Sequence, residues 1–460
     1  MGFKMVNAEF TLVASAADKA TSLRVITKEE LAKADAQLRR LARAQGFEAA
    51  AGSLLAIASP QGDVTQWLVG APSIDADPFT LGAISSKLPA GTYRFEKTPE
   101  HAHLVALGWA LELYKYDPFR PIKTKLVRLL LPKGVDANAV HREADAAFLA
   151  RDLINAPANL MGPDELEQAA RKVAKAHGAK LSVTTATKLA KQFPLIHVVG
   201  AASPRAPRLI DFTWGSARHA KVTLVGKGVC FDTGGLDIKP SAGMLIMKKD
   251  MGGAANVLAL AQMIMAAKLP VRLRVLIPAV ENAIAGNAFR PGDVFKTRKG
   301  LSVEIGNTDA EGRLVLCEAL ALADEEKPDL LIDMATLTGA ARVALGPDLP
   351  PFYTDDAAFA ARLSHHAAAS NDPLWQLPLW KPYMAMIETP IADLNNAGQG
   401  GFAGSITAAL FLKRFVEHAK TYAHFDIFGW TPTSKPGRPR GGEAQALRAC
   451  FGAIAERFVK

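Results

Sequence analysis

Short apolar runs that alternate with helical segments constrain the fold of this 460-residue chain more than any other feature. The runs have no polar face, which is typical of strands that are buried on both sides of a sheet. Apolar residues at helical spacing occupy the stretches between them, as in 163–177 and 253–267. This alternation predicts a mostly parallel sheet with helices on both faces, in a three-layer α/β/α domain. The expected strands are 195–199, 209–212, 221–225, 271–279 and 330–334.

The first part of the chain is predicted to be a smaller α/β domain. We place it at residues 1–140, and the residues there do not indicate its role. A helix over about 139–154 connects it to the second domain, which spans 141–460. In the N-terminal domain, apolar spacing predicts helices over 28–45, with Thr27 as the N-cap, and over 101–114, and strands over 63–70 and 125–131.

Composition excludes several classes of protein. The chain has 54 Lys and Arg against 45 Asp and Glu, without a block of like charges, so binding to nucleic acid is not expected. Its three cysteines are widely spaced, which argues against a disulfide framework or a cysteine zinc site and favours a reducing, cytoplasmic location. The best apolar helix, 257–271, is shorter than the about 20 residues of a membrane span. No contact with a membrane is predicted.

Acidic residues gather in glycine-rich loops that follow expected strands. Four such carboxylates would repel one another if they met, and a pair of divalent cations would reverse that interaction. Two ions about 3.5–4 Å apart polarise a carbonyl group and supply hydroxide near neutral pH. We also expect the last two carboxylates to share one face of an extended segment, because alternate residues point the same way. The four residues are Asp232, Asp250, Asp309 and Glu311.

Each of these residues also has an ordinary structural explanation. An aspartate beside glycine is commonly a turn or a helix cap, and Lys227 and Lys239 would usually be solvated. Arg313, at the start of an apolar stretch, would usually form an ion pair. Gly252 and Gly253 precede a helix and could cradle a phosphate, but no Walker or dinucleotide-binding pattern accompanies them. From the residues alone, a two-metal hydrolase is one interpretation among these.

Several longer motifs resemble one known family. Asn307-Thr-Asp-Ala-Glu-Gly-Arg-Leu is similar to the signature octapeptide of the leucyl aminopeptidase family, the M17 cytosol aminopeptidases. Three further segments match that family in order and spacing, and the resemblance covers roughly residues 150–460. They are Val225-Gly-Lys-Gly through Lys239-Pro-Ser-Ala-Gly-Met, Lys249-Asp-Met-Gly-Gly-Ala-Ala and Asp333-Met-Ala-Thr-Leu-Thr-Gly-Ala.

The resemblance implies a metallo-aminopeptidase with two divalent ions, Zn²⁺ or Mn²⁺ in the first place and Co²⁺ or Mg²⁺ as alternatives. It implies that a water or hydroxide bridging the ions attacks the peptide. Lys239 would act as an electrophile toward the carbonyl, and Arg313 would hold a bicarbonate that carries the proton. One ligand, Lys227, would have to be a neutral amine, because two cations depress its pKa. The implied metal ligands are Lys227, Asp232, Asp250, Asp309 and Glu311.

The resemblance also implies a peptide substrate with a free α-amine and a homohexamer. Main-chain groups of Leu337 and Gly339 would bind the peptide, and Met247 and Thr336 would line the pocket for its first side chain. Phe428 stands where familiar members carry a small residue. It would either narrow this pocket in favour of small side chains or pack into the core.

Two other functions stay open at this point. One is a DNA-binding or architectural protein that retains a peptidase fold, although such a protein has no need of the complete ligand set. The other is a di-metal phosphoesterase, which shares the ions but not the requirement for a free amine.

Overall fold

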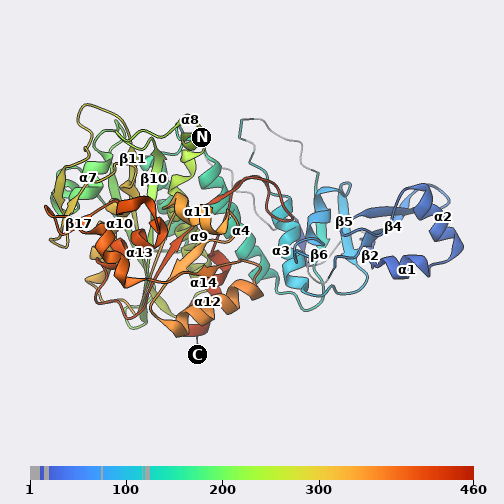
Figure 1. The fold of residues 1–460 in the computed structure, drawn as a ribbon. Coiled ribbons are helices and arrows are strands. Elements are labelled where there is room, and N and C mark those ends of the chain that lie inside the picture. Colours follow the sequence, from blue (N-terminus) through green and yellow to red (C-terminus); the bar gives the residue numbers. More distant parts are fainter. Residues whose placement is uncertain (1–10, 15–19, 74–75, 117, 120–124, 460) are drawn as a thin grey trace. The chain divides into compact units, whose positions relative to one another are not determined.

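The computed structural model describes residues 11–14, 20–73, 76–116, 118–119 and 125–459. They form two compact units, and Figure 1 labels their elements. Unit 1 extends to Phe148 and includes Thr433–Arg440, whereas unit 2 comprises Leu149–Pro432 and the chain from Gly441 onward. The division between them falls inside helix α4 (Ala137–Asn155), the helix in which the sequence placed the connection. The expected two-domain α/β organisation is therefore present.

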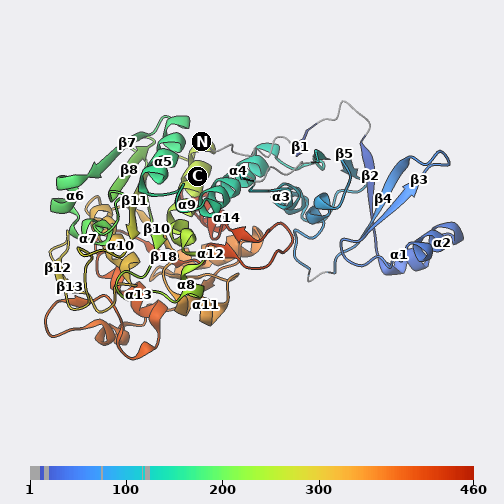
Figure 2. The same ribbon diagram turned by 90° about the horizontal axis from the view of Figure 1, so that it is seen from above.

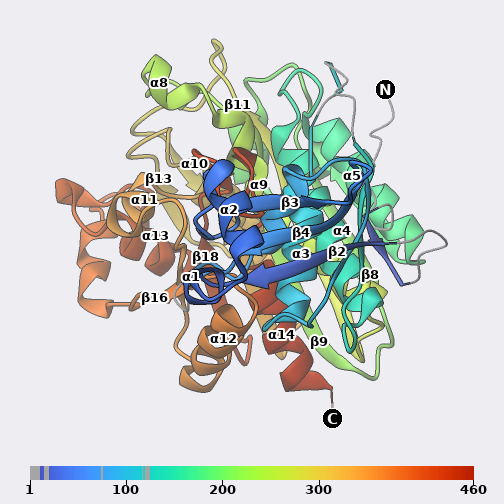
Figure 3. The same cartoon turned by 90° about the vertical axis from the view of Figure 1, so that its right-hand side faces the viewer.

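Unit 1 contains a six-stranded sheet in the order β1-β6-β5-β2-β4-β3, in which only β3 and β4 pair antiparallel. Figure 3 shows β2, β4 and β3 next to one another. The strands are β1 (Leu12–Val13), β2 (Thr21–Ile26), β3 (Leu54–Ala58), β4 (Val64–Gly70), β5 (Gly91–Phe95) and β6 (Val127–Leu130). The helices are α1 (Lys28–Ala32), α2 (Ala36–Ala44), α3 (Ala102–Glu112) and the 3₁₀ helix η2 (Gly82–Ser86).

The single helix expected over 28–45 is two helices. Thr27 caps α1 as predicted, with its side chain accepting the Glu30 N–H at 3.1 Å. A second cap interrupts the pattern, because the Asp35 side chain accepts the Leu38 N–H at 2.8 Å and starts α2. Aspartate competes for backbone donors in this way and so begins a new helix instead of continuing the first.

The segment Thr433–Arg440 packs within unit 1, although it follows more than 280 residues of unit 2 in the chain. The Arg438 guanidinium pairs with Asp77 at 2.6 Å and lies 4.8 Å from the centroid of the Phe79 ring. Gly437 adopts a φ of 65°, and a Cβ there would come within 2.8 Å of Phe79. No pattern in the sequence predicted that this late segment belongs to the first unit.

Unit 2 is built on a mixed sheet whose centre is parallel. β9 pairs parallel with β11 and β14, and β14 pairs parallel with β18, whereas β7, β8 and β15 add antiparallel edges. The strands are β7 (Lys180–Thr185), β8 (Arg208–Trp214), β9 (Ala220–Gly226), β10 (Gly228–Asp232), β11 (Val271–Asn282), β14 (Leu330–Ala335), β15 (Pro351–Tyr353), β16 (Trp375–Gln376) and β18 (Tyr422–Asp426).

Helices cover both faces of this sheet (Figure 2). On one face, α5 and α14 pack on α9, and α12 packs on α14. On the other, α7 and α13 pack on α10, around a core that includes Val225, Leu314 and Phe411. The helices are α5 (Pro163–Ala176), α6 (Ala186–Gln192), α7 (Pro194–Gly200), α8 (Ser241–Met244), α9 (Gly252–Ala266), α10 (Glu311–Asp324), α11 (Gly339–Leu345), α12 (Ala357–Ala369), α13 (Gly404–Lys413) and α14 (Leu447–Phe458).

Smaller elements complete unit 2. A three-stranded sheet consists of β12 (Val294–Lys296), β13 (Ser302–Glu304) and β17 (Leu394–Asn395), and a two-stranded one of β19 (Trp430–Thr431) and β20 (Gly441–Gly442). The 3₁₀ helices are η3 (Met247–Met251), η4 (Lys381–Ile387) and η5 (Gln399–Gly401). In the described part of the chain, no helix has the length and apolar character that crossing a membrane requires.

One predicted strand is wrong. Residues 195–199 form most of helix α7, which begins at Pro194. The buried side chains Leu195, Ile196 and Val199 recur at helical spacing and pack against α10. A short apolar run fits a buried strand and a buried helix equally well, and proline at the first helical position favours the helix. The other expected strands of this domain lie within β8, β9, β11 and β14.

A buried ion pair fixes the part of α4 that belongs to unit 2. Arg151 contacts both carboxylate oxygens of Glu443, at 3.0 and 3.1 Å, and both residues are buried. We expect Arg151→Met to destabilise unit 2 by about 3–5 kcal/mol, because Glu443 would be left as an uncompensated buried charge. Thermal unfolding of the variant measures this loss. Adding Glu443→Gln should recover part of the stability, and a lower stability of the double variant would contradict the explanation.

Candidate active site

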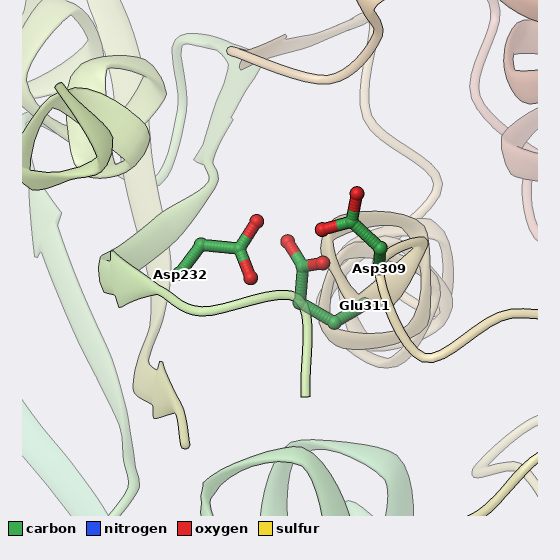
Figure 4. A group of neighbouring side chains, drawn as sticks. All are labelled: Asp232, Asp309 and Glu311. Carbon is green, nitrogen blue, oxygen red and sulfur yellow. The ribbon is translucent and has the colours of Figure 1, made fainter. Parts of the chain in front are cut away.

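Three carboxylates converge at the ends of elements of unit 2. Asp232 is the last residue of β10, Asp309 lies in the turn before α10, and Glu311 is the first residue of α10. One oxygen of each lies within 4.8 Å of the others, and Figure 4 shows the three groups facing one another. Asp232 and Glu311 are buried, whereas the Asp309 side chain is 32% exposed.

The expected extended segment 309–311 is not present. Ala310 precedes the first turn of α10 with φ −110° and ψ 38°, so Glu311 projects from a helix and Asp309 from a turn. Both side chains still lie near Asp232. The direction in which α10 starts places Glu311 there, and the alternation of a strand plays no part.

Asp250 reaches the cluster through Lys227. It lies on η3, outside the group of three carboxylates that could hold one ion. The Lys227 Nζ is 2.7 Å from Asp250 Oδ2 and 3.0 Å from Glu311 Oε1, and it donates to the Thr336 carbonyl at 3.1 Å. The Thr336 hydroxyl in turn donates to Asp250 Oδ1 at 2.8 Å. Lys227 and Asp250 are therefore held beside Glu311, as the proposed ligand set requires.

Close approach explains two glycines of the motifs. A Cβ on Gly312 would come within 2.5 Å of the Lys227 side chain, so glycine after Glu311 leaves room for that lysine. A Cβ on Gly253 would come within 2.0 Å of the Met334 carbonyl, where α9 packs against β14. Both positions need the absence of a side chain.

Burial and a neighbouring negative charge raise the pKa of two of the carboxylates. Burial, reinforced by Asp232, raises the pKa of Glu311 to about 8 and that of Asp309 to about 6. Burial alone would lower the pKa of Lys227, but Asp250, Glu311 and Asp232 outweigh it and hold the pKa above its ordinary value. Without other cations, the acidic surroundings therefore favour the charged form of Lys227. Nearby dications would oppose that effect.

The donor set fits divalent cations. Oε2 of Glu311 is fully enclosed and accepts no hydrogen bond, whereas Oε1 of Glu311 and Oδ2 of Asp250 already face the Lys227 ammonium. The four carboxylates outnumber the two lysines paired with them, Lys227 and Lys239, and divalent cations would balance the remaining negative charge. Carboxylates together with a nitrogen donor suit ions such as Zn²⁺ and Mn²⁺.

Lys239 and Arg313 lie beside this cluster. The Lys239 Nζ pairs with Asp232 Oδ2 at 2.8 Å and also contacts Asp309 Oδ1, and 14% of its side chain is exposed. Arg313 is buried, and its Nε has no hydrogen-bond partner. Burial lowers the pKa of Arg313 to about 10, and it forms no ion pair with any residue the structure describes. A buried guanidinium of this kind fits an anion such as bicarbonate.

The expected peptide-binding groups are only partly free. The N–H groups of Leu337 and Thr338 donate to Asp426 Oδ1 at 3.1 and 3.0 Å. The Leu337 N–H is therefore committed to Asp426, and the expected main-chain contact with a substrate stays a prediction for its carbonyl. The Thr338 and Ser405 hydroxyls donate to Asp426 Oδ2 at 2.6 and 2.9 Å. Asp426 thus anchors the loop that begins α11 at Gly339, a role that the motifs did not indicate.

Phe428 lies between two cationic side chains, and its expected place in the pocket or in the core stays a prediction. Its ring is half-buried, and its centroid lies 4.9 Å from the Lys249 Nζ and 5.2 Å from the guanidinium carbon of Arg342. Burial lowers the pKa of Lys249 to about 8. Met247, at the start of η3, is half-buried. Sequence reasoning passed over Lys249, although it directly precedes the proposed ligand Asp250.

Comparison with known proteins identifies the family. Residues 148–451 match the catalytic domain of the cytosol aminopeptidase family, and residues 23–132 match the M17 aminopeptidase N-terminal domain. The chain belongs to the cytosol aminopeptidase family. Members of this family are metallo-aminopeptidases, and the family predicted from the motifs is confirmed.

Individual cytosol aminopeptidase relatives agree with this assignment. A probable cytosol aminopeptidase of Chlorobaculum parvum is 41% identical over 320 residues, which are 67% of this chain and 63% of the relative. One from Desulfovibrio desulfuricans is 38% identical over 377 residues, 79% of this chain and 75% of the relative.

Solved structures extend the likeness over both units. The cytosol aminopeptidase from Coxiella burnetii is 44% identical with a TM-score of 0.93, covering 97% of this chain and 99% of that one. The bottromycin maturation enzyme BotP in complex with Mn is 31% identical with a TM-score of 0.85, covering 95% and 99%. The predicted fold class is confirmed.

Proposed function

We propose that this chain removes the N-terminal residue from peptides with a free α-amine. Two divalent ions would be held by Lys227, Asp232, Asp250, Asp309 and Glu311. The observation that supports this most strongly is the group of three converging carboxylates, in which Oε2 of Glu311 is enclosed and accepts no hydrogen bond. Zn²⁺ or Mn²⁺ suits these donors, and Co²⁺ or Mg²⁺ is an alternative. The related BotP structure is described as a complex with Mn.

The ions, when bound, would polarise the scissile carbonyl and lower the pKa of a water molecule near it. Lys239 is the residue that we assign to the developing oxyanion, because its Nζ is partly exposed beside Asp232 and Asp309. Its present partners are carboxylates, and cations bound to those carboxylates would free the ammonium to donate to the substrate. Donors aimed at an oxyanion commonly contribute a large part of a rate enhancement.

Arg313 is assigned to the proton transfer that the leaving amine needs. Its buried guanidinium, which has no ion-pair partner among the residues described, would hold bicarbonate as the proton carrier. We place the side-chain pocket at Met247, Thr336 and Phe428, and the main-chain contacts at the Leu337 carbonyl and Gly339. The free α-amine would be recognised at the ions, which an acylated nitrogen does not bind well because its lone pair is delocalised.

We expect N-acetylation of a peptide to lower its hydrolysis by at least about 100-fold, because the acetylated nitrogen loses its metal contact. The measurement compares matched free and N-acetylated peptides, with chelator-treated protein before and after Mn²⁺ or Zn²⁺ is restored. Metal-dependent cleavage of the free peptides alone supports the proposal. Equal cleavage of both peptides would argue against an aminopeptidase, and cleavage of a phosphoester instead would favour the phosphoesterase alternative.

We also propose that the chain forms a homohexamer and works in the cytoplasm. The described cysteines Cys230, Cys317 and Cys450 are free and buried, in keeping with a reducing compartment, and the relatives are named cytosol aminopeptidases. Light scattering coupled to size-exclusion chromatography tests the assembly. A role in nucleic-acid binding has no observation in its favour.

A further inference from the structure

Lys249 is a buried lysine that has no anionic partner among the described residues. It lies on η3, and only 5% of the residue is exposed. Within the ranges that the structure covers, its Nζ makes no hydrogen bond or ion pair, and its contact is with the ring of Phe428, 4.9 Å away. Other buried cations of unit 2 are paired, such as Lys227 with Asp250 and Arg151 with Glu443. Lys249 therefore has an unmet requirement for an anion.

The ammonium tip of Lys249 keeps contact with solvent. The described polar atoms that are fully enclosed and lack a hydrogen bond include Nε of Arg313 and the oxygens of Glu311, but not Nζ of Lys249. Because Nζ has no partner either, its absence from this group means that it is not fully enclosed.

The nearest carboxylates are committed to other groups. Asp250 is paired with Lys227 at 2.7 Å and accepts the Thr336 hydroxyl. Asp426 accepts four hydrogen bonds from the loop before α11 and from Ser405. Neither forms an ion pair with Lys249. A buried charge that lacks a partner is unfavourable, so an anion brought by a ligand would be stabilised there.

A second cation lies on the same aromatic ring. The guanidinium carbon of Arg342 is 5.2 Å from the centroid of the Phe428 ring, and the Lys249 Nζ is 4.9 Å from the same centroid. The charged ends of both side chains lie over the ring, which attracts them through cation–π interaction but supplies no negative charge. The surroundings of Phe428 therefore favour a negatively charged group over a neutral one.

We propose that Lys249 is a specificity-determining residue that selects peptides whose N-terminal residue is aspartate or glutamate. This proposal rests on the proposed function, because it requires the peptide N-terminus to be held at ions beside Asp250. Lys249 directly precedes Asp250, and Phe428 stands at the assigned side-chain pocket. The first side chain of such a peptide would extend toward Phe428 and place its carboxylate against the Lys249 ammonium. A hydrogen bond between two charged groups is about twice as strong as a neutral one.

The test measures kcat/KM for peptides that differ only in the first residue, Asp, Asn, Glu, Gln or Leu. The wild-type protein should cleave the Asp and Glu peptides about tenfold faster than the Asn and Gln peptides, the gain expected for one charge-assisted hydrogen bond. Lys249→Met should abolish this preference and retain cleavage of the Leu peptide. Methionine keeps the length and the apolar character of the lysine stem but removes the charge.

Lys248→Met is the matched control. Lys248 is the neighbouring residue on η3, but its Nζ already donates to the Asn155 carbonyl at 2.6 Å. This variant should keep the preference for acidic residues, and Lys249→Arg should keep it too.

Three results would separate the possibilities. An Asp-to-Asn ratio that is the same in wild-type protein and in Lys249→Met overturns the proposal. If Lys249→Met is inactive toward every peptide, the Asp-to-Asn ratio of kcat/KM is compared in wild-type protein and in Lys249→Arg. A wild-type ratio of one or below overturns the proposal. Failure of metal-loaded wild-type protein to cleave any of the five peptides refutes the proposed function itself, and this specificity with it.

Discussion

Glu311→Gln is expected to lower kcat/KM by about 10³-fold or more and to weaken metal binding by more than about 100-fold. Glu311 is buried among Asp232, Lys227 and Asp250; its Oε1 lies 3.0 Å from the Lys227 Nζ, and its Oε2 accepts no hydrogen bond. Glutamine keeps the shape but replaces one anionic oxygen with an amide that repels cations. Peptide hydrolysis and a Zn²⁺ or Mn²⁺ titration by calorimetry measure the two losses.

Glu318→Gln is the matched control for this variant. Glu318 lies on the same helix, is also buried, and burial raises its pKa to about 8. Its carboxylate accepts the N–H groups of Leu195 and Arg298 and is not part of the cluster. Activity should therefore stay within a few-fold of wild type. Full metal affinity in Glu311→Gln would contradict the assignment of Glu311 as a ligand.

Lys239→Met is expected to lower kcat by about 10²–10³-fold while KM changes little, which is the usual cost of removing one donor to an oxyanion. The Lys239 Nζ lies within 2.8 Å of Asp232 and remains partly exposed, so it is placed to meet a substrate carbonyl near the ions. The measurement is steady-state kinetics on a free-amine peptide, with the metal content of each preparation determined alongside.

Two variants separate catalysis by Lys239 from a structural role. Lys239→Arg keeps a positive charge and should recover part of kcat. Lys221→Met removes a lysine whose Nζ donates to the Glu326 carbonyl at 2.7 Å, outside the site, and should leave kcat unchanged. An unchanged kcat in Lys239→Met at full metal content would remove Lys239 from the proposed mechanism.

Residues close together in the chain account for what could be predicted without a structure. The octapeptide that begins at Asn307 holds Asp309, Glu311 and Arg313 within five positions, and its resemblance to the family signature implies a metal site. Apolar periodicity likewise located β9, β11, β14 and α9, because burial on a sheet or helix repeats at a fixed spacing. It did not distinguish strand from helix in the short run at 195–199.

Contacts between distant residues were decided only by the tertiary structure. Asp426 binds the loop at Leu337 across 89 positions, and Arg438 meets Asp77 across 361. The direction in which α10 starts, and not strand alternation, brings Glu311 to Asp232. Lys249 has no carboxylate partner because Asp250 and Asp426 already interact with other donors. The sequence by itself therefore determined the family and the fold class, and it supplied the residues that we propose for the site. Only the tertiary structure shows which of the charged side chains form ion pairs, because ion pairing depends on distances in space that local sequence patterns do not encode.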